Sequence, residues 1–340
     1  MTQRATIAQV AKRARVSQAT VSRVLNHSDR VDPKMASRVN KAVEFLGYTP
    51  NRYARALAGA STGTVGLVFF DFLESLFHNP YWGNALNSLY SEMGRLNLQC
   101  HLIAQSNNIK VTKASYERSE YIKFLNSRHV DAFIVVGHPT KNQKLAFEQC
   151  EIPTVIWGQP VNSASKVTYI DTDNYAGAFL ATQHLISIKR RKIAIITGRL
   201  DTQVREDRLK GYADALSQNG IKQNEKLIAE GDFTRESGRR AMKSLLERNL
   251  KVDAVFASND EMAMGAIEIL RERKIKIPSD VAVIGVDRST SSGDQNFLST
   301  LSVNYKEISS SIVEAANDLI AGKSVENRMF ELVLHLRQST

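Results

Sequence analysis

Hydrophobic positions in the first 50 residues repeat with the period of an α-helix. In the first predicted helix the apolar residues fall at i, i+3, i+4 and i+7: Ile7, Val10, Ala11 and Ala14. Thr6 precedes them, with Gln9 at capping-box spacing. Ser17 can cap a second helix, and Asp32-Pro33 and Gly47 can start and end a third. The pattern predicts a helix-turn-helix unit, in which two short helices meet at a tight turn and a third supports them.

From residue 64 onward the pattern changes to short apolar runs that alternate with helical stretches. The predicted strands are Val65–Phe70, Leu98–Ala104, Ala132–Val136, Thr154–Trp157, Lys192–Thr197, Ala254–Ala257 and Val281–Gly285. The predicted helices are Tyr81–Leu96, Tyr116–Ser127, Asn174–Ser187, Arg205–Asn219, Arg235–Glu247 and Glu261–Arg271. Such alternation is typical of parallel sheets covered by helices on both faces. Two successive series predict an α/β core of two doubly wound lobes with a crevice between them.

Positive charge is concentrated at the N-terminus. The chain carries a formal net charge of +10, and residues 1–60 hold 11 basic but only 3 acidic residues. The other 280 residues are nearly balanced, with 34 basic and 32 acidic groups. This asymmetry points to a polyanionic partner, with nucleic acid the first candidate.

Length, cysteine usage and hydropathy indicate a cytoplasmic protein of two or three domains. A chain of 340 residues exceeds one ordinary core. It contains no apolar run long enough to span a membrane and no secretory signal at its start. Cys100 and Cys150 are too few for a disulfide framework, so a reducing compartment fits best.

Three motifs give the chain a family resemblance. The segments TIAQVAKRARVSQATVSRVLN, VNKAVEFLGYTPN and ARALAG closely resemble the lac-repressor (LacI/GalR) family of bacterial transcription regulators, without a gap through the first 60 residues. The resemblance implies that Gln18, Ala19 and Arg23 face the bases of double-stranded operator DNA, where Arg23 suits guanine and Gln18 suits adenine. It also implies phosphate contacts from hydroxyl and amide side chains: Thr6, Ser17, Thr20, Ser22, Asn26 and Tyr48.

The segment Thr49–Gly59 matches the hinge helix of that family. It has a cap, a proline at the first helical position and a closing glycine, but it is too short to be stable alone. We therefore expect it to fold on DNA, paired with the same segment of a second subunit, with Asn51 and Ala58 at the DNA. Leu57 is the expected apolar wedge in the minor groove, although it can instead be an exposed linker leucine. The predicted domains are a helix-turn-helix at 1–49, a hinge at 50–60 and an effector-binding core at 61–340.

The core resembles the family through RLKGY, FASNDEMAMGAI and VIGVD, and it has the two-lobed plan of periplasmic binding proteins. We expect the lobes to comprise roughly 61–170 plus 300–325, and 171–299 plus 326–340. Polar and aromatic residues that follow the predicted strands, where ligands bind in open α/β sheets, form the candidate effector site: Phe72, Tyr81, Trp157, Arg208, Phe233, Asn259, Asp287 and Tyr305. The segment Asp171–Asn174 falls at the same edge. Each assignment has a structural alternative, because Arg208 can form a salt bridge within its lobe, Asn259 can cap a helix, and Phe233 and Tyr305 can be core residues.

Three departures from the family pattern leave the effector's identity open. Gly158-Gln159 follows Trp157 where many members carry an acid, Arg288 replaces a second acid, and a proline before FLSTLSV is absent. A Trp-Gly pair at this place is similar to members that respond to glucosides. We expect a small effector, a sugar, with a nucleobase or a protein co-repressor as the alternative regulator.

Other functional classes fit the sequence less well. We find no nucleophile elbow, P-loop, HExxH motif or clustered Cys/His set, so we expect no enzymatic activity, no cofactor and no metal. A sugar-binding transport protein shares the two-lobed core, but it needs a signal peptide and has no basic head. The sequence therefore predicts a homodimeric repressor of carbohydrate-utilisation genes that binds a near-palindromic operator and no membrane.

Overall fold

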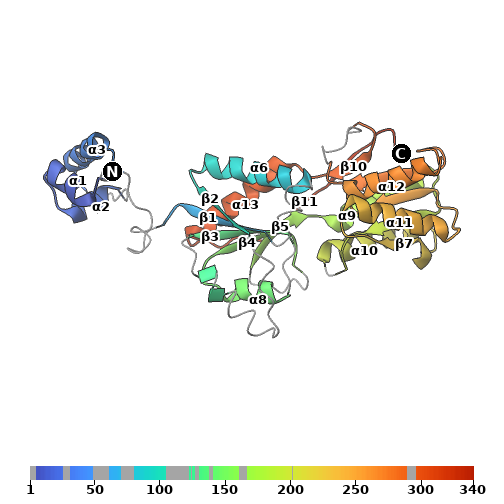
Figure 1. Cartoon of the computed structure of the whole chain (residues 1–340). Helices are drawn as coiled ribbons and strands as arrows, with labels where there is room; N and C mark the ends of the chain where they lie inside the picture. Colours follow the sequence, from blue (N-terminus) through green and yellow to red (C-terminus); the bar gives the residue numbers. More distant parts are fainter. Residues whose placement is uncertain are drawn as a thin grey trace. The chain divides into compact units, whose positions relative to one another are not determined.

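The computed structural model describes eleven segments: residues 5–25, 31–48, 61–69, 80–104, 122–123, 125–126, 130–137, 141–160, 167–200, 202–288 and 296–340. The chain forms two compact units, Met1–Thr64 and Val65–Thr340 (Figure 1). Most of the predicted helix Tyr116–Ser127 lies outside the described residues, as do the predicted hinge and Asn26.

The N-terminal unit contains the three expected helices: α1 (Ile7–Ala14), α2 (Gln18–Leu25) and α3 (Pro33–Leu46). Thr6 and Gln9 form the predicted capping box, in which each side chain accepts a hydrogen bond from the other residue's backbone. Asp32 caps α3 through its carboxylate, and Gly47 ends it in the left-handed conformation. The helices enclose a small apolar core: Val10, Ala11, Ala14, Val21, Val24, Val39 and Ala42.

The first sheet of the core has the strand order β11-β5-β4-β3-β1-β2. Its strands are β1 (Thr64–Phe69), β2 (Gln99–Ala104), β3 (Ala132–Val136), β4 (Thr154–Trp157), β5 (Thr168–Thr172) and β11 (Arg328–Phe330). The pairs β1–β3, β3–β4, β4–β5 and β5–β11 are parallel. Successive side chains of β3 point to opposite faces of the sheet and pack in different hydrophobic cores, because side chains alternate along a strand. Ile134 packs with α6 (Pro80–Arg95) and α13 (Tyr305–Ile320), whereas Phe133 packs with α8 (Lys141–Gln149).

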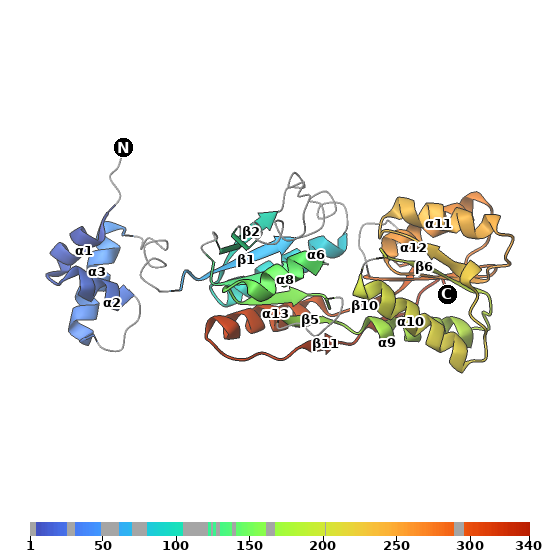
Figure 2. The same cartoon turned by 90° about the horizontal axis from the view of Figure 1, so that it is seen from below.

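The second sheet has the order β12-β10-β9-β8-β6-β7. Its strands are β6 (Ile193–Thr197), β7 (Ile228–Glu230), β8 (Ala254–Ala257), β9 (Ala282–Val286), β10 (Ser299–Ser302) and β12 (Val333–His335). One face is covered by α9 (Asn174–Ser187) and α10 (Gln203–Gln218), and the other by α11 (Arg235–Glu247) and α12 (Asp260–Glu272) (Figure 2). Ile195 faces the α9–α10 side and Ile196 the α11–α12 side. The predicted α/β class with two doubly wound lobes is confirmed, except that β12 joins the sheet antiparallel to β10.

The chain passes between the lobes at positions that differ from the expected boundaries. Residues 300–302 were expected in the first lobe, but β10 pairs with β9 in the second sheet. Residues 328–330 were expected in the second lobe, yet β11 pairs with β5 at the edge of the first sheet. Residues 171–172 likewise belong to β5. The physical reason is strand pairing. An edge strand has unpaired backbone N–H and C=O groups, and a strand that is near in space but remote in sequence can form hydrogen bonds with them.

Among the described residues, no helix combines the length and apolar character that a membrane span requires. Cys100 and Cys150 are both free thiols, and burial raises the pKa of each.

Candidate DNA interface and effector site

Helix α2 presents a polar outer face and an apolar inner face. Gln18, Ala19 and Arg23 are exposed, while Val21 and Val24 are buried against the other two helices. The residues expected to face the bases are therefore the accessible side chains of this helix. This geometry is what base-edge contact in a major groove requires.

The hydroxyl residues expected at the phosphates also stabilise the head itself. The Ser17 hydroxyl accepts a hydrogen bond of 3.1 Å from the backbone N–H of Thr20, and the two hydroxyls lie 2.9 Å apart. Thr6 is exposed in its capping box, and Ser22 is half-buried. Tyr48 is half-buried against the core of the head. The other predicted DNA contacts lie outside the described residues: Asn26, Asn51, Leu57 and Ala58.

Three aromatic side chains of the first lobe meet at one end of its sheet. Tyr81 is at the start of α6, Trp157 ends β4, and Tyr305 starts α13. The Tyr81 ring lies 6.3 Å from the Trp157 ring and 5.8 Å from the Tyr305 ring, centroid to centroid. Residues from three separate elements therefore form one aromatic cluster. Phe72, the remaining predicted effector contact of this lobe, lies outside the described residues.

Arg208 lies on α10, where its side chain is buried and forms hydrogen bonds with two other segments of the chain. Its Nε donates a hydrogen bond of 3.0 Å to Oδ1 of Asn174, and its Nη1 donates to the backbone oxygen of Ser258. Burial lowers the pKa of Arg208, while Asp287, Tyr81 and Asp171 oppose that shift. Arg208 thus interacts electrostatically with residues from both lobes.

Two carboxylates accompany this guanidinium. Burial raises the pKa of Asp171 to about 6 and that of Asp287 to about 7, and Arg208 lowers both. Asp171 is saturated by the protein, since it accepts bonds of 2.7 Å from the backbone N–H groups of both Gln159 and Thr172. No described residue donates a hydrogen bond to the carboxylate of Asp287. Asp287 is therefore an acceptor that remains available to a ligand.

The backbone around Asp287 is held in an unusual conformation. Its φ angle is 107°, a region that residues other than glycine rarely occupy. Its N–H donates a hydrogen bond of 2.7 Å to Leu301, and its carbonyl accepts one of 3.2 Å from the Tyr305 hydroxyl. These bonds fix the direction of the carboxylate at the end of β9. Local strain of this kind is typical of functional positions.

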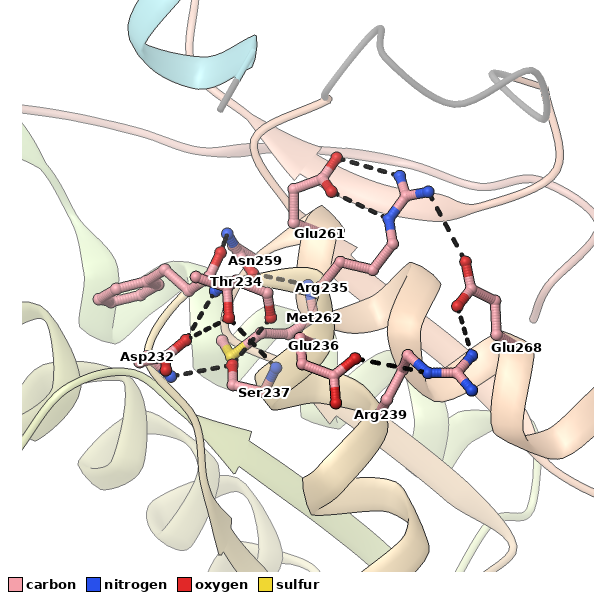
Figure 3. Close-up of polar contacts among 11 residues, drawn as sticks. Asp232, Thr234, Arg235, Glu236, Ser237, Arg239, Asn259, Glu261, Met262 and Glu268 are labelled. Atoms are coloured by element: carbon pink, nitrogen blue, oxygen red, sulfur yellow. Dashed lines mark hydrogen bonds and ion pairs between the residues drawn. The ribbon is translucent and has the colours of Figure 1, made fainter. Parts of the chain in front are cut away.

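Asn259 is placed by the structure as a helix cap. Its Oδ1 accepts a hydrogen bond of 2.9 Å from the backbone N–H of Met262, and its Nδ2 donates one of 2.9 Å to the carbonyl of Phe233 (Figure 3). Its exposed fraction is only 2%. Phe233 has a φ angle of 71°, and its ring lies directly over Gly198. Asn259 therefore positions the Phe233 turn beside the site.

Ion pairs join α11 to α12 next to this turn. Arg235 forms a two-pronged pair with Glu261, with N–O distances of 3.0 and 3.3 Å. Glu268 links Arg235 to Arg239 at 3.6 and 2.6 Å (Figure 3). Glu261 also raises the pKa of Asp287, so this network influences the ionisation of a site residue.

Two buried polar atoms at the site have no hydrogen-bond partner among the described residues: Nε1 of Trp157 and the hydroxyl of Ser258. Both residues are at most 2% exposed. The Trp157 N–H is close enough to the Tyr81 oxygen to lower the pKa of that phenol slightly, but its geometry does not make a hydrogen bond. Unsatisfied buried donors are costly, and a ligand oxygen can satisfy them.

Seven of the eight predicted effector residues lie in the described part of the chain, and ring contacts, hydrogen bonds and electrostatic interactions link them. Tyr81, Trp157 and Tyr305 form the aromatic cluster, Tyr305 binds Asp287, and Arg208 reaches the residue preceding Asn259. The structure adds three residues that the predicted set lacks: Asp171, Asn174 and Ser258. The first two lie in the segment Asp171–Asn174, but only the hydrogen bonds from Arg208 to Asn174 and from Asn174 to Asp171 show their part in the site. The described residues contain no cluster of acidic, histidine and cysteine side chains that could hold a metal.

A helix-turn-helix head combined with a two-lobed core that gathers ligand-type residues defines a ligand-responsive transcription regulator. Comparisons with known proteins agree. Residues 6–51 match the family described as bacterial regulatory proteins, lacI family, and residues 182–340 match the periplasmic binding protein-like domain. The chain belongs to the lacI family of bacterial regulatory proteins, as its sequence motifs suggested.

Relatives are similar along most of the chain. The HTH-type transcriptional regulator CelR of Thermobifida fusca is 36% identical over 289 residues, covering 84% of this chain and 83% of the relative. The HTH-type transcriptional regulator AscG of Escherichia coli (strain K12) is 37% identical over 294 residues, covering 83% and 82%. The structure of a CelR–cellobiose complex matches with a TM-score of 0.75 and 32% identity over 99% of this chain and 100% of that one. The lac repressor dimer bound to operator and an anti-inducer shares the fold, with a TM-score of 0.80, 23% identity and 99% of each chain covered.

Proposed function

We propose that this regulator represses carbohydrate-utilisation genes and is released from its operator by a small sugar. The observation that carries this proposal is the association of an aromatic cluster with the unsatisfied Trp157 N–H and the open Asp287 carboxylate. Sugar hydroxyls pair with such donors and acceptors, and the C–H faces of a sugar pack on aromatic rings. The CelR structure that contains cellobiose adds support, because that protein is similar over nearly the whole chain.

The proposed DNA contacts divide into two kinds. Gln18, Ala19 and Arg23 read bases, while Thr6, Ser17, Thr20, Ser22, Asn26 and Tyr48 position the head on phosphates. The hinge at 50–60 becomes helical on the operator and places Asn51, Leu57 and Ala58 at the minor groove. The regulator acts in the cytoplasm by binding and not by catalysis.

A homodimer is part of the proposal, since two heads on a near-palindromic operator require two-fold symmetry. Exposed apolar side chains on the first lobe support it. Tyr90 on α6 is 67% exposed and Leu102 on β2 is 43% exposed, and β2 is an edge strand of its sheet. A second subunit that covers this edge removes apolar surface from water.

The proposed mechanism is a thermodynamic linkage between effector binding and operator binding. Tyr81, Trp157 and Tyr305 belong to the first lobe, whereas Arg208 and Asp287 belong to the second. A ligand that contacts both sets favours one arrangement of the lobes. That arrangement separates the paired hinges and weakens operator binding, and the operator reciprocally weakens effector binding.

The test is operator binding by the full chain, measured by fluorescence anisotropy with DNA from the promoter of its own gene and a panel of sugars. One sugar should release tight, salt-sensitive binding, and Asp287→Ala should abolish this release without loss of operator affinity. Tight binding that no sugar changes would contradict the sugar effector and direct the search to nucleobases or a protein co-repressor. A normal response of Asp287→Ala would contradict the assigned site.

A further inference from the structure

Among the described residues, carboxylates outnumber cations around Arg208, Asp171 and Asp287. Five carboxylates act on the central residues of the site, again among the described residues: Asp171, Asp207, Asp260, Glu261 and Asp287. In the same part of the chain, Arg208 is the one cation that acts on both Asp171 and Asp287. Its charge is therefore already matched within the protein.

Most of these carboxylates have partners of their own. Asp171 accepts backbone N–H groups, Asp260 accepts the Thr300 hydroxyl at 2.6 Å, and Glu261 pairs with Arg235. Asp207 accepts the Gln203 amide at 2.8 Å. The exception is Asp287, whose carboxylate no described residue binds. Among the described carboxylates of the site, Asp287 is thus the one whose oxygens accept no hydrogen bond from a described residue.

The neighbouring arginine does not correct this imbalance. Arg288 is exposed, and its backbone N–H donates to the Thr300 hydroxyl at 3.3 Å. Its positive charge lowers the pKa of His335 on β12 and is not among the causes that act on Asp287. Arg288 therefore does not offset the negative charge of Asp287.

We infer that this site selects an uncharged sugar and rejects its phosphorylated or carboxylated counterpart. The inference rests on the proposed sugar-binding function and narrows its ligand class. Above the pKa of Asp287, which is about 7, a second anion beside its carboxylate lacks a compensating cation among the described residues. The low-polarity surroundings of three aromatic rings screen the repulsion poorly. A neutral glycoside instead gives its hydroxyl hydrogens to Asp287 and an oxygen to the Trp157 N–H.

Shape supports the same ligand class. Tyr81, Trp157 and Tyr305 supply ring surface from three elements, which suits the flat apolar face of a glucoside or a longer glycoside. Asn174 takes the Nε–H of Arg208 and Ser258 takes one Nη1 hydrogen, so the side-on pair that includes Nε is not free to clamp a phosphate.

The experiment compares matched ligand pairs by isothermal titration calorimetry on the full chain. The probes are glucose with glucose 6-phosphate, and cellobiose with cellobiose 6′-phosphate, at low and high salt. The comparison uses the pair whose uncharged sugar binds more tightly. In that pair the phosphorylated sugar should bind at least about 30-fold more weakly than the uncharged one, a difference of about 2 kcal/mol. Equal affinity, or tighter binding of the phosphorylated ligand, overturns the inference and leaves the sugar-responsive regulator standing. Absence of binding by all four probes counts against the proposed sugar function itself.

Two variants locate the origin of the discrimination. Asp287→Asn removes the open charge and should reduce the ratio of the two affinities at least fivefold, whatever its effect on either affinity alone. Glu247→Gln is the control, because it removes one charge at the exposed end of α11, where Glu247 forms no ion pair with a described residue. An equal change of the ratio in both variants means that net charge sets the ratio, which overturns the assignment to Asp287.

Discussion

The Tyr305 hydroxyl donates a hydrogen bond of 3.2 Å to the backbone oxygen of Asp287. Tyr305 begins α13, which packs against the first sheet, and Asp287 directly follows β9 of the second sheet. This bond therefore connects an aromatic wall of the site to its open carboxylate. Burial and the charge of Asp287 together raise the pKa of the Tyr305 phenol well above its ordinary value, so it remains a donor at physiological pH.

Replacement of that hydroxyl tests the connection. Tyr305→Phe keeps the ring and removes one hydrogen bond, so we expect about a 3- to 10-fold loss of effector affinity, equivalent to a bond of about 1 kcal/mol. Operator affinity without effector should not change. Calorimetry and anisotropy measure the two quantities, and a loss of operator affinity alone would contradict the role in the effector site.

Asp287 should make the stability of the protein depend on pH. Its pKa rises from an ordinary 3.8 to about 7 in the folded chain, so the folded state holds this proton more tightly than the unfolded state. The favourable contribution of protonated Asp287 to the free energy of unfolding is complete below about pH 4. It is lost as the pH rises through about 7. Asp171, with a pKa near 6, acts in the same direction.

The variant Asp287→Asn isolates this contribution. Asparagine carries no charge and tolerates a positive φ angle, so above about pH 7 we expect a gain of roughly 1–2 kcal/mol in unfolding free energy. Near pH 4 the difference should vanish, because both side chains are then neutral. Thermal unfolding across this pH range measures it. A gain that is the same at every pH would show that the carboxyl does not titrate as described.

Arg23 should carry base discrimination and not only affinity. Arg23→Ala removes an exposed guanidinium from α2, and we expect a loss of about 1–3 kcal/mol for the operator. Arg23→Lys retains the charge but not the two-pronged geometry, so nonspecific affinity should recover while specificity does not. Anisotropy with operator and scrambled DNA separates the two effects. Full recovery of specificity by lysine would make Arg23 a phosphate contact.

Leu57 offers a test of the hinge. Leu57→Ala should lower operator affinity far more than nonspecific affinity, because a minor-groove wedge acts only where the DNA is kinked. The same two DNA probes measure this difference. Equal losses on both would remove the wedge role.

Glycine positions test the packing of α11 on α12. A Cβ at Gly238 would lie 2.2 Å from the backbone oxygen of Met262, so Gly238→Ala should cost about 2–3 kcal/mol. Gly94 on α6 is the matched control, since no atom lies within 4 Å of its added Cβ. Gly94→Ala should stabilise the chain by about 0.5–1 kcal/mol through helix propensity. Chemical denaturation measures both, and a neutral Gly238→Ala would contradict this close helix contact.

The amino-acid sequence by itself determined the local features. The Thr6–Gln9 capping box, the apolar stripe of α1 and the strands Ala132–Val136 and Thr154–Trp157 all follow from residues close together in the chain. Their signals are periodicity and capping, which depend on backbone geometry within one or two turns. The family motifs likewise predicted the class of regulator and named most of the candidate effector residues.

Only the tertiary structure decided which distant segments meet. The pairing of β11 with β5 and of β12 with β10 sets the passage of the chain between the lobes, and no local pattern encodes it. The contact of Arg208 with Asn174 and Ser258 joins residues 34 and 50 positions apart, so it too depends on the assembled sheets. The same assembly places the carboxylate of Asp287 where no described residue donates a hydrogen bond to it.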